Sequence, residues 1–425
     1  MAVRKVDNAI KNLLADMGAR ARVAVHVLAQ ASNEQKDMAL AKAAMALRNR
    51  AADILSANAK DMAAAKEQGL DASMLDRLML DAARVEAMAA GLETVATQPD
   101  PVNKILDEWD RPNGLVLQRV SVPLGVVGVI YESRPNVTAD AAALLIKSGN
   151  AAILRGGSES LHSSAAIATC IHEGLKEAGL PEHAVQLVPV KDREAVNAML
   201  AMSDHIDVIV PRGGKSLTQL VKEQSKVPTL LHLDGNCHTY IHVSAKPELA
   251  RDVVVNAKLR RTGICGATES LLVDKDVAKS IIPLLAGSLI EKGCELRGDT
   301  AACALDSRIK PATEEDWGTE YLAPVLSIKT VAGLDEAVAH INRYGSHHTD
   351  AIIAEDKNAV RRFLRQVDSA IVMHNTSTQF ADGGEFGFGA EIGIATGRLH
   401  ARGPVGAEQL TTYKYVVHGS GQVRP

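Results

Sequence analysis

The stretch GVVGVI at residues 125–130 is a short, continuous apolar run, the pattern of a strand that is buried on both faces. Upstream, Asn113-Gly114 is a turn signal, and the alternating residues 115–122 after it predict a half-buried strand. Downstream of residue 150, helical and strand-like segments alternate. The strand-like segments are 151–154, 185–190, 206–210 and 229–233, and the helical ones are 158–178, 192–203 and 215–225. Such alternation is typical of parallel βαβ units in a doubly wound sheet.

The later half of the chain repeats this alternation. Helices are expected at 249–259, 334–343 and 356–366, and strands at 270–273, 325–330, 351–354 and 370–373. We therefore expect an α/β protein with two doubly wound domains, which fits 425 residues better than one very large sheet.

The two ends of the chain have different characters. The first 98 or so residues are rich in Ala, Leu, Met and Lys and predict helices, including a long one that begins after Ser32 and ends at Gly69. The segment 408–418 reads as a strand that pairs with a hairpin at 113–122, which makes a small third unit of β structure.

Composition excludes several classes of function. The net charge is −4 and only 3% of residues are aromatic, so neither a field nor a stacking platform for nucleic acid is present. The longest apolar run, residues 281–290, is shorter than the roughly 20 residues that cross a bilayer. Five cysteines without a CxxC pair, and an N-terminus without the features of a targeting leader, favour a reducing cytoplasm.

Three well-known motifs fail. Gly213-Gly214-Lys215-Ser216 resembles the end of a P-loop, but Ile209 stands where that motif needs glycine. The run around Gly387 would need a glycine at Ile392 to be a dinucleotide fingerprint. There is no HExxH and no cluster with metal-ligand spacing, so no metal cofactor is expected.

Cys265 is the strongest candidate for a chemical role. Glycines flank it at positions 263 and 266, and Arg260 and Arg261 are close in sequence, a setting that exposes a sulfur and favours its thiolate. On context alone, a small buried hydrophobe is an equally good interpretation of Cys265. Cys237, in a turn after Gly235-Asn236, is the rival.

The run VAGLDEAVAHINRYGSHHTDAI at residues 331–352 resembles the signature of one family, the glutamate-5-semialdehyde dehydrogenases of the aldehyde dehydrogenase superfamily. The resemblance extends over essentially the whole chain. It implies an aldehyde dehydrogenase-like fold with a cofactor-binding domain (1–107, 128–231 and about 366–398), a catalytic domain (232–365) and an oligomerisation hairpin (108–127 with 399–420). The roles of individual residues within His340–Asp350 stay unassigned.

The resemblance also implies roles for single residues. Cys265 matches the nucleophile, and Asn136 matches the asparagine whose amide helps to hold the oxyanion. Glu320 matches the glutamate that contacts the nicotinamide ribose. The cofactor's adenosine side is expected at Arg155-Gly156, and its pyrophosphate near the helix start at Gly213-Gly214. Without the family match, Asn136 would be read as a turn residue and Glu320 as a surface carboxylate.

One departure from the superfamily is informative. Hydrolytic aldehyde dehydrogenases carry a water-activating glutamate in the pattern Leu-Glu-Leu-Gly-Gly, whereas residues 231–235 read Leu-His-Leu-Asp-Gly. His232 is expected to be structural, with Asp234 left as a partial substitute for the base. Loss of the glutamate suits an acyl-enzyme that must exchange with phosphate instead of water.

The resemblance therefore implies an NADPH-dependent reduction of L-glutamyl 5-phosphate to L-glutamate 5-semialdehyde, with release of phosphate, in proline biosynthesis. Two alternatives remain open: an acylating aldehyde dehydrogenase that uses coenzyme A, and a catalytically silent scaffold of the same fold. A homo-oligomer is expected, and glutamate 5-kinase is a possible partner as a separate protein.

Overall fold

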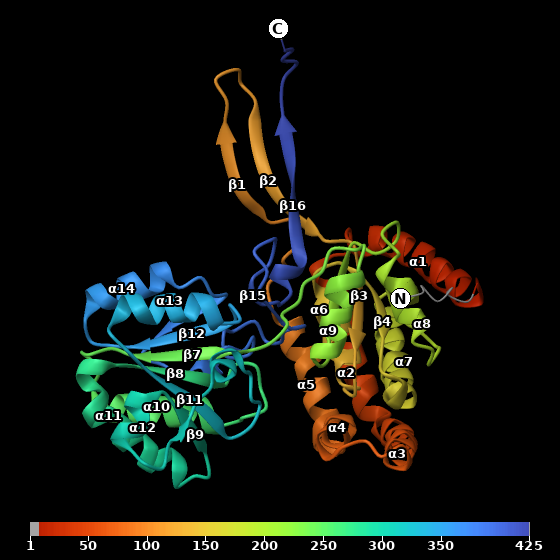
Figure 1. The fold of residues 1–425 in the computed structure, drawn as a ribbon. Helices are drawn as coiled ribbons and strands as arrows, with labels where there is room; N and C mark the ends of the chain where they lie inside the picture. The colour runs from red at the N-terminus through yellow and green to blue at the C-terminus, as the bar shows by residue number, and fades with distance from the viewer. Residues whose placement is uncertain (1–7, 425) are drawn as a thin grey trace. The chain divides into compact units, whose positions relative to one another are not determined.

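The computed structural model describes residues 8–424 and divides them into two compact units (Figure 1). The first unit comprises the described residues up to Leu231, together with Gly387–Gly393 and those from Val405 onward. The second comprises His232–Phe386 and Ile394–Pro404. Each unit contains a parallel sheet with helices, so the predicted α/β class with two sheets is confirmed.

The sheet of the first unit has four parallel strands in the order β5-β4-β3-β6. They are β3 (Val126–Tyr131), β4 (Ala151–Arg155), β5 (Val185–Leu187) and β6 (Val208–Arg212). Every residue of β3 and β4 is buried, as the apolar run at 125–130 predicts for strands covered on both faces. The strand expected at 229–233 is wrong: only a single bridge, from Thr229 to Ile209, forms there.

Nine α-helices accompany this sheet among the described residues. They are α1 (Asn8–Leu28), α2 (Asn33–Asn49), α3 (Ala51–Glu67), α4 (Ala72–Leu78), α5 (Ala82–Ala96), α6 (Val137–Lys147), α7 (Leu161–Glu177), α8 (Glu194–Leu200) and α9 (Lys215–Gln224). Ser32 caps α2 through a capping box with Gln35, as expected of a helix start. The single long helix predicted from there to Gly69 is wrong, because the backbone turns at Arg50 (φ −105°, ψ 19°) and starts α3, which lets both helices contact α7.

A separate antiparallel sheet in the first unit has the order β1-β2-β16. Its strands are β1 (Ile105–Asp110), β2 (Val116–Pro123) and β16 (Thr411–His418), which Figure 1 shows as a long ribbon. The predicted pairing of the C-terminal strand with the segment 113–122 is confirmed by the register Thr411 to Pro123 through His418 to Val116. The partner β1 was not predicted, because half of the residues in ILDEWD are acidic and they do not alternate with the apolar ones.

The second unit is built on seven parallel strands in the order β10-β9-β11-β8-β7-β12-β13. They are β7 (Cys237–Ile241), β8 (Thr268–Asp274), β9 (Glu295–Gly298), β10 (Lys310–Pro311), β11 (Val325–Val331), β12 (Thr349–Ile353) and β13 (Ile371–His374). Its α-helices are α10 (Pro247–Leu259), α11 (Lys275–Ile290), α12 (Thr300–Leu305), α13 (Leu334–Tyr344) and α14 (Lys357–Gln366). Two short strands, β14 (Ile394–Ala395) and β15 (Gly403–Pro404), pair with each other.

Helix α11 contains the long apolar run at 281–290 and packs into the core of the second unit. Its buried residues Ile281, Ile282, Leu285 and Leu289 meet Leu271 and Val273 of β8 in one cluster. Within residues 8–424, no helix is both long and apolar enough to cross a membrane.

Candidate active site

Cys265 lies in the loop between α10 and β8 and is partly exposed. Burial raises the pKa of Cys170 and of Cys294 to about 11, and it raises the pKa of Cys237 strongly. Those three thiols therefore stay protonated at neutral pH. The rival nucleophile Cys237 is fully buried, and its Sγ donates to the carbonyl of Cys265 at 3.0 Å. Cys237 thus supports the loop that presents Cys265.

The backbone of the Cys265 loop lies against the backbone of Gly235, in the segment that precedes β7. A Cβ built on Gly235 would lie 2.2 Å from the carbonyl oxygen of Cys265 and 2.6 Å from its Cα. No side chain fits at that distance, so only glycine allows this approach. In the sequence, Gly235 has the pattern of a turn residue, and its place at the end of Leu-His-Leu-Asp-Gly is the only signal of this close approach.

Two histidines lie beside the sulfur of Cys265. One ligand atom from each of His232, Cys265 and His348 falls within 4.8 Å of the other two. The two imidazole rings meet edge to face, with centroids 5.2 Å apart. His232, expected to be structural, is thus placed next to the candidate nucleophile, where hydrolytic relatives of the superfamily carry their glutamate. This position does not by itself give His232 a role in proton transfer.

Glu320 is held next to the same segment from the loop before β11. Its Oε1 accepts a hydrogen bond from the backbone N–H of Gly235 at 2.9 Å. Two residues on, the N–H of Leu322 donates to Glu269 of β8 at 3.2 Å, and Glu269 also pairs with Lys258 of α10 in a fully buried ion pair. Burial raises the pKa of Glu269, and the charge of Lys258 opposes that rise. The structure therefore brings both Cys265 and Glu320 next to Gly235.

The run His340–Asp350 has three distinct roles in the structure. His340 packs among aromatic rings, 4.6 Å from the ring of Tyr344 and 5.7 Å from that of Trp317, and burial lowers its pKa to about 3. His348 lies at the Cys265 cluster. Asp350 accepts two hydrogen bonds from His238 of the neighbouring strand β7, from the backbone N–H at 2.8 Å and from Nδ1 at 3.1 Å.

Asn136 lies in the first unit, where it precedes α6 after the loop that follows β3. Its amide Nδ2 donates to Oδ2 of Asp140 at 2.8 Å. Burial raises the pKa of Asp140 to about 6, while the Asn136 amide and the charge of Arg212 oppose the rise. This hydrogen bond fixes the orientation of the Asn136 amide, with its NH₂ group toward Asp140. Its part in an oxyanion site with Cys265, which belongs to the second unit, stays a prediction.

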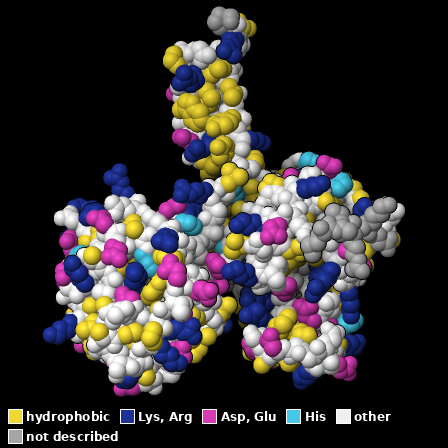
Figure 2. Space-filling model, viewed as in Figure 1, with side chains coloured by type: hydrophobic (Ala, Val, Ile, Leu, Met, Phe, Trp, Pro, Cys, Tyr) yellow, Lys and Arg dark blue, Asp and Glu magenta, His cyan; other side chains and the backbone are white. Residues whose placement is uncertain are grey.

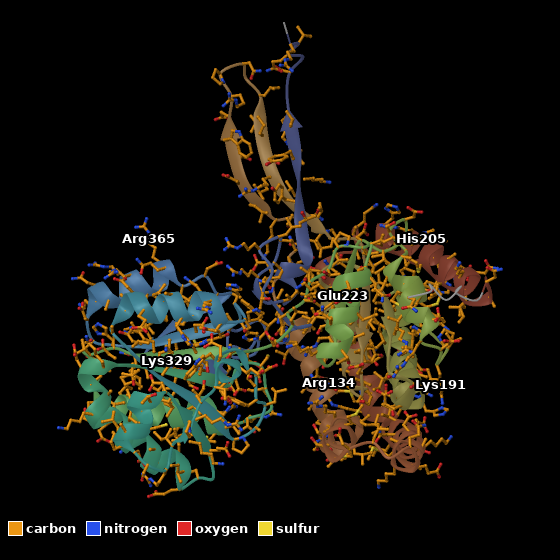
Figure 3. The ribbon with its side chains drawn as sticks, in the orientation of Figure 1. Arg134, Lys191, His205, Glu223, Lys329 and Arg365 are labelled. Carbon is orange, nitrogen blue, oxygen red and sulfur yellow. The ribbon has the colours of Figure 1, made fainter. Side chains whose placement is uncertain are left out.

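The residues expected to hold the cofactor lie at the carboxyl ends of β4 and β6 in the first unit, the edge at which open parallel sheets bind ligands. Arg155 ends β4 and is 6% exposed, and its Nη2 donates to the carbonyl of Lys191 at 3.1 Å. Lys191 follows β5 and is labelled in Figure 3. Burial lowers the pKa of Arg155, and the neighbouring charge of Arg193 lowers it further.

The glycines at this edge lie in close contact with neighbouring side chains. A Cβ on Gly156 would lie 3.0 Å from the ring of Tyr131, and one on Gly213 would lie 2.3 Å from Oε2 of Glu132. The N–H of Gly214, at the start of α9, donates to the same carboxylate at 3.0 Å. A backbone N–H at a helix start is the kind of donor that binds phosphate, and in this structure the Glu132 carboxylate accepts from it.

A nicotinamide dinucleotide fits these residues. Among the described residues, Nε of Arg155 is buried without a hydrogen-bond partner, which marks an unsatisfied donor at the sheet edge. At positions 156 and 213 a side chain would collide with Tyr131 or Glu132, so the backbone there carries no side chain of its own. Arg155, Gly156, Gly213 and Gly214 therefore lie together in the first unit, and Cys265 and Glu320 lie together in the second.

Comparison with known proteins agrees with this architecture. The model of the aldehyde dehydrogenase family matches residues 2–297 and 311–416. A gamma-glutamyl phosphate reductase of Rhodospirillum rubrum is 59% identical over 424 residues, which covers 100% of this chain and 99% of that protein. One of Paramagnetospirillum magneticum is 60% identical over 413 residues, covering 97% of this chain and 98% of that protein.

The chain belongs to the gamma-glutamyl phosphate reductase family, within the aldehyde dehydrogenases. The crystal structure of the Thermotoga maritima reductase matches with a TM-score of 0.95 and 43% identity, over 97% of this chain and 100% of that one. An acetylating aldehyde dehydrogenase of Geobacillus thermoglucosidasius shares the fold alone, at a TM-score of 0.68 and 18% identity. The predicted family and fold are thereby confirmed, and membership implies an enzyme that uses a nicotinamide cofactor.

Proposed function

We propose that the chain catalyses the NADPH-dependent reduction of L-glutamyl 5-phosphate to L-glutamate 5-semialdehyde, with release of inorganic phosphate, as a step of proline biosynthesis. The observation that carries the proposal is the partly exposed Cys265, presented by Gly235 and Cys237, in a chain about 60% identical to gamma-glutamyl phosphate reductases over its full length.

In the first step, the thiolate of Cys265 attacks the acyl carbonyl of the substrate. A C–S bond forms, the C–O bond to phosphate breaks, and phosphate leaves with the electron pair, which gives a thioester on Cys265. The amide of Asn136 and the backbone N–H of Cys265 would stabilise the oxyanion of the tetrahedral intermediate. Removal of one such donor typically costs about 10²–10³ in rate.

The chemistry that NADPH would supply when bound is a hydride for the reduction of the acyl carbon. When the aldehyde forms, the C–S bond breaks and Cys265 leaves as the thiolate, ready for the next cycle. Arg155, Gly156, Gly213 and Gly214 would hold the adenosine and pyrophosphate parts, and Glu320 would contact the nicotinamide ribose. Arg155 and Arg193 bring two guanidinium groups near each other where the adenosine ribose is expected, which favours the 2′-phosphate of NADP over NAD.

The residue at position 232 supports phosphate release over hydrolysis. Because His232 replaces the glutamate of hydrolytic relatives, no carboxylate at that position activates water, and the thioester survives until it is reduced. The acylating alternative with coenzyme A shares this feature, so the acceptor must be tested directly. The alternative of a catalytically silent scaffold is disfavoured because Cys265 is partly exposed and its loop is held in place by Gly235 and Cys237.

The proposal also covers the partner protein, the cellular compartment and the oligomeric state of the enzyme. Glutamate 5-kinase would supply the acyl phosphate as a separate protein, the reaction would take place in the cytoplasm, and copies of the chain would associate through the β1-β2-β16 ribbon.

The test replaces Cys265 by alanine and follows NADP⁺ reduction with glutamate semialdehyde and phosphate. Activity is expected to vanish while the variant still folds, as judged by circular dichroism, and still binds cofactor. Cys303→Ala is the matched control, because Cys303 is also partly exposed but bonds to the carbonyl of Gly298. Retention of most activity by Cys265→Ala would overturn the proposal.

A further inference from the structure

We propose that His232, Cys265 and His348 form a binding site for a thiophilic divalent cation of the zinc class, and that its occupation reversibly blocks the nucleophile. The three residues come from three separate segments of the second unit, and one ligand atom from each lies within 4.8 Å of the other two. Their separation in the sequence explains why no ligand spacing predicted the cluster.

The chemistry of the donor set selects the cation. One thiolate and two imidazole nitrogens suit Zn²⁺, whereas Mg²⁺ and Ca²⁺ prefer oxygen ligands. A tetrahedral zinc ion needs ligand atoms about 3.3–3.6 Å apart, given Zn–S near 2.3 Å and Zn–N near 2.0 Å. The side chain of Cys265 is only partly buried, so rotation about its Cα–Cβ bond can bring the sulfur closer to the two imidazole nitrogens.

Neighbouring groups orient the two histidines as they do in protein metal sites. Nδ1 of His232 lies 2.7 Å from the carbonyl oxygen of Ile394, which can only accept, so Nδ1 carries the proton and Nε2 is the nitrogen with a lone pair. Nδ1 of His348 lies 2.9 Å from the hydroxyl of Thr349. Outer contacts of this kind fix ring orientation in metal sites and are part of their affinity.

Cys237 does not compete for the cation. Its sulfur is buried, its S–H donates to the carbonyl of Cys265 at 3.0 Å, and the same sulfur lies 3.7 Å from Nδ1 of His348, so it already has two partners. With three protein ligands, the fourth position of a tetrahedral ion stays open to water. The bound thiolate has its electron pair on the metal, so it cannot attack an acyl phosphate, and it is also protected from oxidation. Chelation of the metal would restore the free thiolate.

The experiment titrates the reduced full-length protein with Zn²⁺ against a chromogenic chelator, and with Co²⁺ while thiolate-to-metal charge-transfer absorption is recorded. We expect one Zn²⁺ per chain at this site, affinity at least tenfold weaker in Cys265→Ser and His232→Gln, and a charge-transfer band that is absent in Cys265→Ser. The matched controls are Cys303→Ser and His374→Gln, because His374 is exposed and bonds to the carbonyl of Ala354. Both controls should bind as the unmodified chain does.

A second readout does not depend on variants. Alkylation of Cys265 by iodoacetamide, followed by mass spectrometry of the Cys265 peptide, should slow at least tenfold when Zn²⁺ is added and recover when it is chelated. Unchanged zinc affinity in Cys265→Ser, or unchanged alkylation with Zn²⁺ present, would overturn the proposal. Neither readout requires catalytic activity, so failure here and failure of the proposed reaction are distinguishable.

Discussion

Gly235 contacts the backbone of Cys265 so closely that a single added methyl group should displace the Cys265 loop. In Gly235→Ala the new Cβ meets the Cys265 carbonyl at 2.2 Å, so the loop must shift. Overpacking of this kind costs about 1–3 kcal/mol, and a displacement of about 1 Å at the nucleophile can lower the rate about 100-fold. Turnover and the thermal midpoint measure the two effects.

The control for this substitution is Gly287→Ala in α11. No heavy atom comes within 4 Å of a Cβ built there, and alanine favours helix by about 0.5–1 kcal/mol. Turnover should be unchanged in the control and the thermal midpoint equal or higher. Full activity in Gly235→Ala would contradict the close backbone approach.

Asp140 makes stability depend on pH in a direction that can be worked out. Its pKa is raised by burial to about 6, above the value near 3.9 of an unfolded chain, so the folded state binds the proton more tightly. Its contribution to stability is complete below about pH 4 and is lost as pH rises through about 6. Asp140→Asn, whose Oδ1 can still accept from Asn136, should therefore stabilise the chain at pH 7.5 by about 1–2 kcal/mol and give no gain near pH 4.

Thermal unfolding at the two pH values measures this difference. Asp204→Asn, at an exposed aspartate, is the control and should change neither midpoint. A lower midpoint for Asp140→Asn than for the unmodified chain at pH 7.5 would show that the Asp140 carboxylate stabilises the fold.

At the scale of the elements, β7 depends on a polar contact with β12. Asp350 of β12 accepts from the backbone and ring of His238, and it also accepts from the hydroxyl of Ser369. Asp350→Ala would leave these buried donors without a partner, so we expect a loss of about 3 kcal/mol in the free energy of unfolding. Urea denaturation followed by circular dichroism should show a lower midpoint.

Asp335→Ala provides the comparison for Asp350, because the Asp335 side chain is 80% exposed and pairs with Arg362 at the surface. Its removal should change the stability by less than about 0.5 kcal/mol. Equal midpoints for the two variants would mean that the buried network contributes nothing.

Strand β7 is an element that the sequence pattern did not predict. Apolar runs identified β3 and β4, but β7 reads CHTYI, with His238 and Thr239 fully buried. Two of its polar side chains bond to neighbouring strands: Nδ1 of His238 bonds to Asp350 of β12, and the Thr239 hydroxyl lies 2.8 Å from that of Thr268 of β8. A pattern along one segment does not reveal partners on neighbouring strands, so β7 was missed.

The candidate site was predicted only in part for the same reason. Its residues lie far apart along the chain, so Cys265, Asn136 and Glu320 were assigned from the family resemblance, and context alone left Cys265 undecided. The contact of Gly235 with Cys265 and the position of His348 depend on loops meeting in space. The sequence around His348 carries no signal of its position, and for Gly235 the only signal is its place in the pattern Leu-His-Leu-Asp-Gly.

At the scale of the whole molecule, the β1-β2-β16 ribbon offers a surface for a second copy of the chain. Its outer strands β1 and β16 have open edges, and Tyr415 and Val417 are exposed; Figure 2 shows hydrophobic side chains along the ribbon. We expect the chain to be an oligomer by light scattering, and the double variant Tyr415→Lys with Val417→Glu to yield a smaller species.

Val23→Glu is the control for the ribbon, since Val23 is 69% exposed on α1. This substitution should leave the oligomer intact. A monomeric unmodified chain, or equal dissociation by Val23→Glu, would rule out the ribbon as the interface.

In the proposed reaction, Cys265 forms a thioester that exchanges with phosphate. The most direct measurement is the steady rate of NADP⁺ reduction by glutamate 5-semialdehyde, with inorganic phosphate present, omitted, or replaced by coenzyme A. Because His232 stands where hydrolytic relatives carry glutamate, we predict that turnover requires phosphate and falls at least 100-fold without it. Undiminished turnover without phosphate would show a hydrolytic dehydrogenase, and turnover restored by coenzyme A would show an acylating one; either result contradicts the proposed function.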